Sequence, residues 1–149
     1  MRLTRYTDYS LRCLMYLGLH GPQLTSIHEI ATAYGISEHH LTKVVHELGR
    51  SGVVETVRGR GGGIRLGRPA AEIGIGVMVR ATEESFALVD CFSAEGCAIA
   101  GPCQLAPALS EALEAFLAVL DRYTLADLLR DERAGLARAL GLPAPAASG

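Results

Sequence analysis

Two helical patterns joined by a tight turn, and followed directly by a glycine-rich hairpin, constrain the fold of this chain most strongly. The turn is Tyr34-Gly35-Ile36-Ser37. Before it, Ser26-Ile27-His28-Glu29 has the spacing of a capping box, which predicts a helix over 27–34. After it, Ser37 is an N-cap candidate and apolar residues recur at helical spacing, which predicts a helix over 38–50. Two helices joined in this way form a helix-turn-helix.

The segment after these helices is predicted to form a β-hairpin. Residues 53–57 and 64–66 alternate as short strands, and Arg58-Gly-Arg-Gly-Gly-Gly63 lies between them. A hairpin with glycines at the bend and arginines beside them is typical of a DNA-binding wing. A nucleotide phosphate loop is the competing interpretation, but its Lys-Ser/Thr pair is missing and no helix follows.

The rest of the chain is predicted to be mostly helical. Helical patterns cover about 3–19, 73–81 and 104–123, and Thr124 can cap one further short helix. The long pattern over 104–123 has a wide apolar stripe, which predicts a partner helix. The stripe consists of Leu105, Leu109, Ala112, Leu113, Phe116, Leu117 and Leu120.

The predicted fold class is therefore mainly α with a small β-wing: a winged helix-turn-helix followed by a long dimerisation helix. We expect a DNA-binding domain over 1–82 and a cysteine-bearing loop over 83–104. A dimerisation helix and a C-terminal helix should occupy 105–140. The Pro/Ala-rich tail over 141–149 should be disordered.

Charge is distributed unevenly along the 149 residues, whose net charge is −2. Residues 1–80 carry ten Lys/Arg against six Asp/Glu, whereas residues 81–149 carry four against ten. A basic first half suits a polyanionic partner. No run approaches the roughly 20 apolar residues of a membrane helix, and no signal-peptide pattern is present. We therefore expect a cytoplasmic protein without a membrane partner, in which a reducing environment disfavours disulfides.

Two sets of exposed residues are candidates for contacts with double-stranded DNA. Each set alone could be an ordinary solvated surface, but the helix followed directly by the arginine hairpin favours DNA. Candidates for base contacts in the major groove are Glu38, His39, Thr42, Lys43 and His46. Candidates for phosphate and minor-groove contacts are Arg58, Arg60 and Arg65.

Three of the four cysteines lie in one segment with five residues between neighbours: Cys91, Cys97 and Cys103. A structural zinc site is disfavoured because no Cys-x-x-Cys pair is present. Inert buried thiols fit Cys13 better than this Gly/Ala/Pro-rich loop. An iron–sulfur cluster fits the loop best, although three thiolates leave it one short of the usual four ligands. The fourth ligand could be a side chain, a residue of a partner subunit, water or a small molecule.

With these features in this order, residues 1 to about 130 resemble a family of winged-helix iron–sulfur transcriptional regulators. The resemblance rests on Met1-Arg-Leu-Thr-Arg-Tyr-Thr-Asp-Tyr-Ser-Leu-Arg12, on Arg58-Gly-Arg-Gly-Gly-Gly-Ile-Arg-Leu66, and on Val89-Asp-Cys91 with the two further cysteines. Some members have a histidine ligand three residues after the last cysteine, where this chain has Ala106. The nitric-oxide-sensing repressors of the family are therefore more similar, also over 123–128.

The resemblance implies a homodimeric repressor with one cluster per subunit on Cys91, Cys97 and Cys103. It implies Asp8 of the partner subunit as fourth ligand; the alternative is a surface ion pair between Asp8 and Arg12. A [4Fe–4S] cluster is favoured over [2Fe–2S], although three cysteines and one oxygen could hold either. Nitric oxide would attack the iron, weaken DNA binding and derepress genes for nitric oxide detoxification.

Two rival functions remain open from the sequence. A regulator of the same fold could sense iron, cluster supply or redox stress instead of nitric oxide. A protein of another class, an iron–sulfur electron carrier or cluster donor, would not bind specific DNA, and the arginine hairpin argues against it. An enzyme is the least favoured class because no nucleophile–base set or substrate-binding motif is present.

Overall fold

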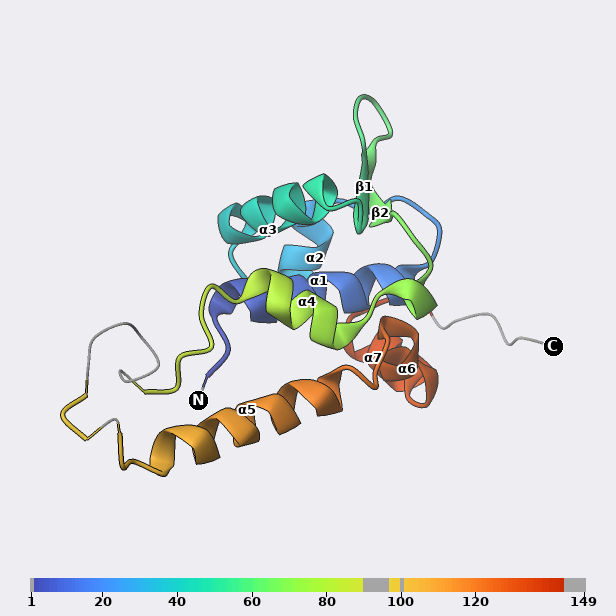
Figure 1. The fold of residues 1–149 in the computed structure, drawn as a ribbon. Helices are drawn as coiled ribbons and strands as arrows, with labels where there is room; N and C mark the ends of the chain where they lie inside the picture. The colour runs from blue at the N-terminus through green and yellow to red at the C-terminus, as the bar shows by residue number, and fades with distance from the viewer. Residues whose placement is uncertain (1, 90–96, 100, 144–149) are drawn as a thin grey trace.

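The computed structural model describes residues 2–89, 97–99 and 101–143. Three helices form the helix-turn-helix bundle in Figure 1: α1 (Arg5–His20), α2 (Ile27–Tyr34) and α3 (Glu38–Arg50). α1 lies at the centre of the molecule and contacts α3, α4, α6, α7 and β2. Its Cys13, Leu14 and Leu17 side chains are buried in the core. The predicted winged-helix fold is confirmed.

The first three helices begin at hydroxyl residues, as the sequence predicts. The side-chain oxygens of Thr4, Ser26 and Ser37 each accept a hydrogen bond from the backbone N–H three residues later. The bounds of α2 and α3 are those predicted. α1 begins two residues later than predicted because Thr4 is its N-cap. Gly35 ends α2 with a φ of 63°, in the left-handed region that glycine favours.

The wing consists of β1 (Val54–Val57) and β2 (Gly63–Leu66), which pair antiparallel with Val54 opposite Leu66. It projects beyond α3 in Figure 1. The tip needs glycine because a Cβ on Gly62 would lie 2.2 Å from the carbonyl oxygen of Val57. At the base, Ile64 is 2% exposed and exchanges backbone hydrogen bonds with Thr25. The wing is therefore attached to the segment that precedes α2.

A 3-10 turn (Ala70–Glu72) and α4 (Ile75–Thr82) follow the wing, and α4 begins two residues later than the predicted helix over 73–81. The long helix α5 (Leu105–Leu120) ends before the predicted residue 123. The reason is a short backbone ladder: Ile75 N–H donates to Tyr123 O at 2.9 Å, and Leu125 N–H donates to Ile73 O at 2.8 Å. These bonds draw residues 121–124 out of the helix.

Two short helices complete the described chain. α6 (Leu125–Arg130) begins at the predicted cap, where Thr124 and Asp127 form a capping box. α7 (Arg133–Ala139) was not predicted as a separate element. The guanidinium of Arg133 donates to the carbonyl oxygens of Gly18 and Leu19, which attaches α7 to the end of α1.

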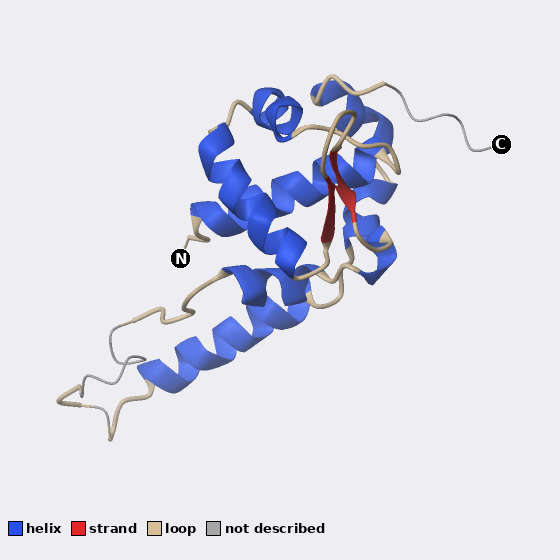
Figure 2. Cartoon of the chain, turned by 90° about the horizontal axis from the view of Figure 1, so that it is seen from above, coloured by secondary structure: helices blue, strands red, loops and turns tan. Residues whose placement is uncertain are grey.

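α5 lies along the outside of the bundle and extends beyond it (Figures 1 and 2). Its C-terminal end is attached to the bundle by Arg80 of α4, whose Nη1 and Nη2 lie 2.5 and 2.8 Å from the carboxylate oxygens of Asp121. None of its residues is buried. The predicted apolar stripe does not all face one surface, because Leu105 and Ala112 are exposed while Leu117 packs partly against the core.

Among the described residues, the helices are too short or too polar to cross a membrane. The predicted disorder of the tail over 141–149 concerns mainly residues 144–149, which lie outside the described residues, as does Cys91.

Replacing Gly18 should test how tightly α1 packs against α6. A Cβ at Gly18 would lie 2.5 Å from Cδ1 of Leu129, whose side chain is only 2% exposed and so can shift only against its packed neighbours. At Gly49 of α3 the nearest atoms would be 3.9 Å away. We expect Gly18→Ala to lower the free energy of unfolding by about 1–3 kcal/mol through overpacking. Gly49→Ala should raise it by about 0.5–1 kcal/mol.

Urea denaturation followed by far-UV circular dichroism measures both changes, with Gly49→Ala as the matched control. Equal stability of Gly18→Ala and the wild type would show that the α1–α6 contact is looser than the structure indicates.

Candidate nucleic-acid interface and cysteine segment

α3 presents a row of basic or protonatable side chains to solvent. His39, Lys43, His46 and Arg50 are all exposed and follow one another at intervals of four, three and four residues. This spacing places them along one ridge of the helix. The rotation of α3 is fixed by its opposite, buried face, which consists of Leu41, Val44, Val45 and Leu48. We call the exposed row the α3 ridge.

The structure exposes all five residues predicted on α3, and three of them already have partners. One is His46, whose Nδ1 lies 3.3 Å from a carboxylate oxygen of Glu47. The carboxylate of Glu38 lies 3.0 Å from Nδ1 of His28 on α2, and both side chains are exposed. The hydroxyl of Thr42 donates to the backbone oxygen of Glu38 at 2.8 Å. Arg50 was missed by the sequence analysis, although its helical spacing from His46 could have identified it.

The wing residues divide into two groups. Arg58 and Arg60 are exposed at the tip, and no hydrogen bond or ion pair is recorded for them within the described residues. Arg65 instead lies opposite Glu55 in the strand pair, with its Nε 2.8 Å from a carboxylate oxygen of Glu55. Arg68, below the wing, donates to the carbonyl oxygen of Ser51 at 2.9 Å and braces the start of β1. The three predicted wing arginines are therefore not equally available to a ligand.

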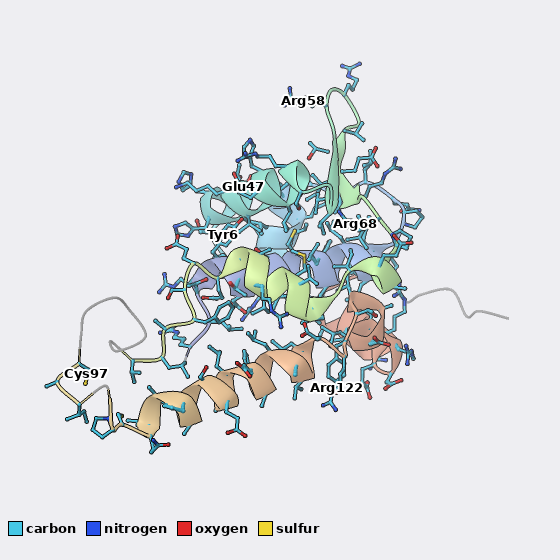
Figure 3. All side chains as sticks on the ribbon, in the orientation of Figure 1. Tyr6, Glu47, Arg58, Arg68, Cys97 and Arg122 are labelled. Carbon is cyan, nitrogen blue, oxygen red and sulfur yellow. The ribbon has the colours of Figure 1, made fainter. Side chains whose placement is uncertain are left out.

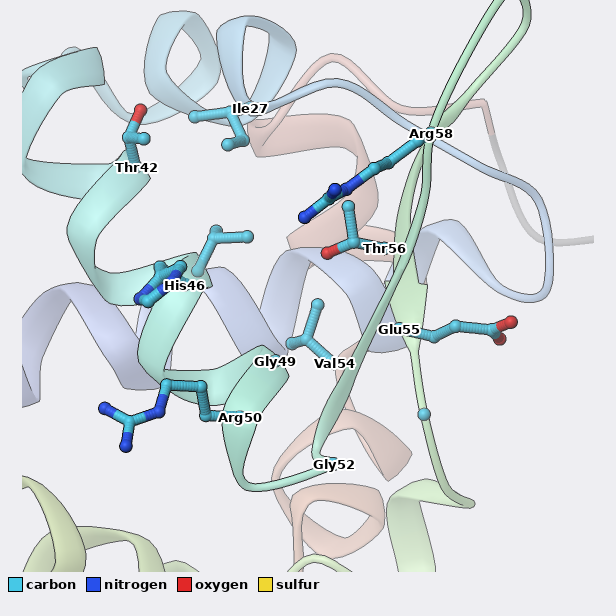
Figure 4. A pocket seen from close by; sticks show the side chains of 12 residues that line it. Ile27, Thr42, His46, Gly49, Arg50, Gly52, Val54, Glu55, Thr56 and Arg58 are labelled. Carbon is cyan, nitrogen blue, oxygen red and sulfur yellow. The ribbon is translucent and has the colours of Figure 1, made fainter.

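An open groove of about 680 Å³ separates the α3 ridge from the wing (Figure 4). His46 and Arg50 line it from α3, and Thr56 and Arg58 line it from the wing. Its apolar lining includes Val54. A groove with basic side chains on both walls can accept a phosphodiester backbone, because phosphate contacts supply most of the affinity of such interfaces.

Two carboxylates lie beside these basic groups. Hydrogen bonds from His46 and then Arg50 lower the pKa of Glu47, and the hydrogen bond from Arg65 lowers the pKa of Glu55. Both glutamates are exposed. They are ionised at neutral pH, and their charge partly cancels that of the neighbouring bases.

The described residues do not bring the three predicted cluster ligands together. Cys91 lies outside them. Cys97 is exposed, and Cys103 is partly exposed just before α5, where its N–H donates to the carbonyl oxygen of Ile99 at 3.1 Å. Both are free thiols. Figure 3 shows Cys97 beyond the N-terminal end of α5, far from Arg122 at the other end. Within the described ranges no three His, Cys, Asp or Glu side chains are grouped to hold a metal ion.

Asp8 and Cys13, both on α1, have well-defined surroundings. Oδ1 of Asp8 lies 2.9 Å from Nε of Arg12, so the surface ion pair considered as its alternative role is present. The guanidinium of Arg12 also lies over the ring of Tyr34, 5.7 Å from its centre. Cys13 is 0% exposed, and burial raises the pKa of its thiol to about 12. It is an inert core residue rather than a ligand candidate.

The recognition helix, the arginine wing and the buried three-helix core define a winged helix-turn-helix DNA-binding protein. The sequence matches the Rrf2 family, described as iron-dependent transcriptional regulators, over residues 3–131. The chain therefore belongs to the Rrf2 family. It is a transcriptional regulator and not an enzyme.

Curated relatives are similar over nearly their whole length. The HTH-type transcriptional regulator NsrR of Geobacillus kaustophilus is 58% identical over 134 residues, which cover 88% of this chain and 91% of that protein. The Bacillus subtilis regulator of the same name is 53% identical over 135 residues, covering 89% and 92%.

Solved structures share the fold. CymR of B. subtilis, the global cysteine regulator, superposes with a TM-score of 0.66 at 30% identity, covering 86% of this chain and 95% of that one. IscR of T. potens gives a TM-score of 0.69 at 27% identity, covering 88% of each chain.

Thiol labelling should separate Cys13 from the cysteine segment. In cluster-free native protein at about pH 8, near the ordinary pKa of cysteine, iodoacetamide should alkylate the exposed Cys97 and leave Cys13 unmodified. In urea both should react, which is the control for intrinsic reactivity. Peptide mass spectrometry measures each site. Equal labelling of the two cysteines in native protein would mean that the core around α1 opens readily.

Proposed function

We propose that this chain is a homodimeric repressor that binds operator DNA and releases it when nitric oxide reacts with an iron–sulfur cluster. The observation that carries the proposal is the α3 ridge beside an arginine wing, in a family described as iron-dependent regulators. The nitric oxide signal rests on the resemblance of the N-terminus, wing and cysteine segment to nitric-oxide-sensing repressors. The relatives named NsrR support the same assignment.

In the DNA complex, α3 would enter the major groove with the α3 ridge towards the base edges. His39, Lys43 and His46 would meet bases or nearby phosphates, and Glu38 and Thr42 lie at the start of the same helix. Arg58 and Arg60 would contact the backbone and the minor groove, whose negative potential attracts arginine. The groove between α3 and the wing would then hold one phosphodiester strand.

A second copy of the chain would pack against α5. Leu105, Ala108, Ala112, Ala115 and Val119 are exposed and follow one another at alternating intervals of three and four residues. This is the spacing of a two-helix seam, and its alanines allow the helix backbones to approach closely. Leu105 and Val119 are 59% and 44% exposed, which is unfavourable for large apolar side chains without a partner. Two copies would present two α3 helices to a pseudo-palindromic operator.

The cysteine segment fits a cluster in its donor chemistry. Cys97 and Cys103 are free, solvent-accessible thiols, and Cys91 precedes them at the same spacing. Thiolates are the usual ligands of iron–sulfur clusters, and Asp8 of the partner subunit would complete the set of four. A [4Fe–4S] cluster bound there would supply the iron that nitric oxide attacks.

The position of α5 explains how a change in the cysteine segment would reach DNA. The N-terminal end of α5 follows Cys103 directly, while Arg80 and Asp121 attach the C-terminal end to the DNA-binding domain. Altered ligation would therefore shift one end of the dimerisation helix relative to the other. The spacing between the two α3 helices would change, and affinity for a fixed operator spacing would fall.

The main alternative is a signal of iron supply or redox state in the same fold. The description of the family as iron-dependent favours it. In that case iron depletion or oxidation, and not nitric oxide, would control operator binding.

A titration with nitric oxide distinguishes these signals. The anaerobically purified protein is added to a fluorescent duplex selected from a random-sequence library, and anisotropy and visible absorption are recorded together. We expect both to fall in parallel as nitric oxide is added. Cys103→Ser should lose the response, whereas Cys13→Ala, which changes a buried thiol, should keep it. Absorption changes without loss of DNA binding would contradict nitric oxide sensing.

Introducing a charged side chain on the exposed face of α5 should disrupt the dimer. Val119→Glu places a carboxylate in the proposed seam and should convert the protein to a monomer in sedimentation velocity experiments. Its control is Val77→Glu on α4, where an even more exposed valine (66%) lies outside α5. This variant should remain dimeric. If both variants sediment like the wild type, the second copy does not pack on this face of α5.

A further inference from the structure

Three exposed carboxylates, two on α3 and one on the wing, are each paired with a basic side chain. Glu38 lies 3.0 Å from His28. Glu55 accepts from Arg65 across the wing at 2.8 Å. Glu47 has two partners on the α3 ridge: Arg50 at 3.2 Å and His46 at 3.3 Å.

The carboxylates of Glu47 and Glu55 each pair with an arginine that could otherwise bind a phosphate. Arg50 lines the groove between α3 and the wing, and Arg65 stands on β2 opposite Glu55. All four side chains of the two pairs are between 40% and 70% exposed, so a phosphate can reach each arginine and compete with its carboxylate. No such partner is recorded, within the described part of the chain, for Lys43 or Arg58.

We propose that Glu47 and Glu55 are specificity-determining residues that keep the affinity for non-operator DNA low by occupying Arg50 and Arg65. The proposal rests on the proposed function, since it takes this face as the DNA interface. It concerns discrimination between duplexes and not the signal that releases them.

The physical argument is that non-specific binding comes almost entirely from phosphate contacts. Each lysine or arginine that pairs with a phosphate steepens the slope of log K against log[salt] by about 0.9. An arginine held by a carboxylate must break that ion pair before it contributes. At an operator, base contacts fix the complex and these two arginines need not be recruited, whereas binding to other sequences depends on recruiting every available phosphate contact. The carboxylates therefore weaken non-specific binding more than specific binding.

The local chemistry keeps both carboxylates charged. Hydrogen bonds from His46 and Arg50 lower the pKa of Glu47, and Arg65 lowers the pKa of Glu55. Because a lowered carboxyl pKa keeps the group ionised down to more acidic pH, both ion pairs persist throughout the neutral range. The competition with phosphate is thus a constant property of the surface rather than a pH switch.

The test uses Glu47→Gln, Glu55→Gln and the double variant in the full-length, cluster-loaded protein. Binding to a scrambled duplex of about 30 base pairs and to a library-selected duplex of equal length is measured by anisotropy across a salt series. From the loss of one competing carboxylate we expect about three- to tenfold tighter binding to the scrambled duplex. The salt slope should steepen by about 1 per substitution. Affinity for the selected duplex should rise less, so the ratio between the two falls.

Two controls keep the result interpretable. Glu132→Gln removes a carboxylate from the start of α7, on the far side of the molecule from the wing (Figure 1), and should change neither affinity nor slope. Adding Arg50→Gln to Glu47→Gln should erase the gain, because the freed arginine is then absent. Thermal denaturation verifies that each variant is folded.

The outcomes separate this inference from the proposed function. If the wild type binds neither duplex, the DNA-binding function itself fails and the inference fails with it. If the wild type discriminates but the glutamine variants bind the scrambled duplex no more tightly, only the inference is overturned. It is also overturned if both duplexes gain affinity equally, because the carboxylates would then not contribute to specificity.

Discussion

The burial of α1 is the interaction on which the rest of the structure depends. This helix contacts α3, α4 and α6, and its Leu14 and Leu17 side chains are almost fully shielded from solvent. Burying two leucines of this kind contributes about 1.5–3 kcal/mol each. The same helix therefore sets the orientation of the recognition helix on one side and of the elements that hold α5 on the other. Neither functional part has a separate core of its own.

Much of this fold could be predicted because local signals agreed with one another. The caps at Ser26 and Ser37, the turn at Gly35 and the glycines of the wing each specify backbone geometry through neighbouring residues. The largest error, at the end of α5, arose where a distant backbone contact decides the outcome. The sequence around Tyr123 does not predict that its carbonyl oxygen accepts a hydrogen bond from the N–H of Ile75 and so ends α5 early, because the two residues are far apart in sequence.

The candidate site could be predicted in its composition but not in its electrostatics. The α3 and wing residues follow from helical spacing and from the glycine-rich bend. The pairing of Arg65 with Glu55 depends on strand register, and that of Arg50 with Glu47 on side-chain conformations that spacing permits without requiring. The ligand role of Cys91, Cys97, Cys103 and Asp8 stays a prediction. Their convergence would involve a second subunit and residues outside the described ranges.

The one-sided attachment of α5 has a mechanical consequence. Its 16 residues correspond to a rod of about 24 Å, which is held to the bundle at one end beside Asp121. A tilt of only about 5° at that attachment would displace the tip near Cys103 by about 2 Å, from the length of such a rod. Conversely, if the tip of α5 near Cys103 moved by about 2 Å, the helix would rotate by about 5° at its attachment to the bundle. In the proposed repressor, α5 would therefore act as a lever that turns a small change in cluster ligation into a small change of angle at the bundle.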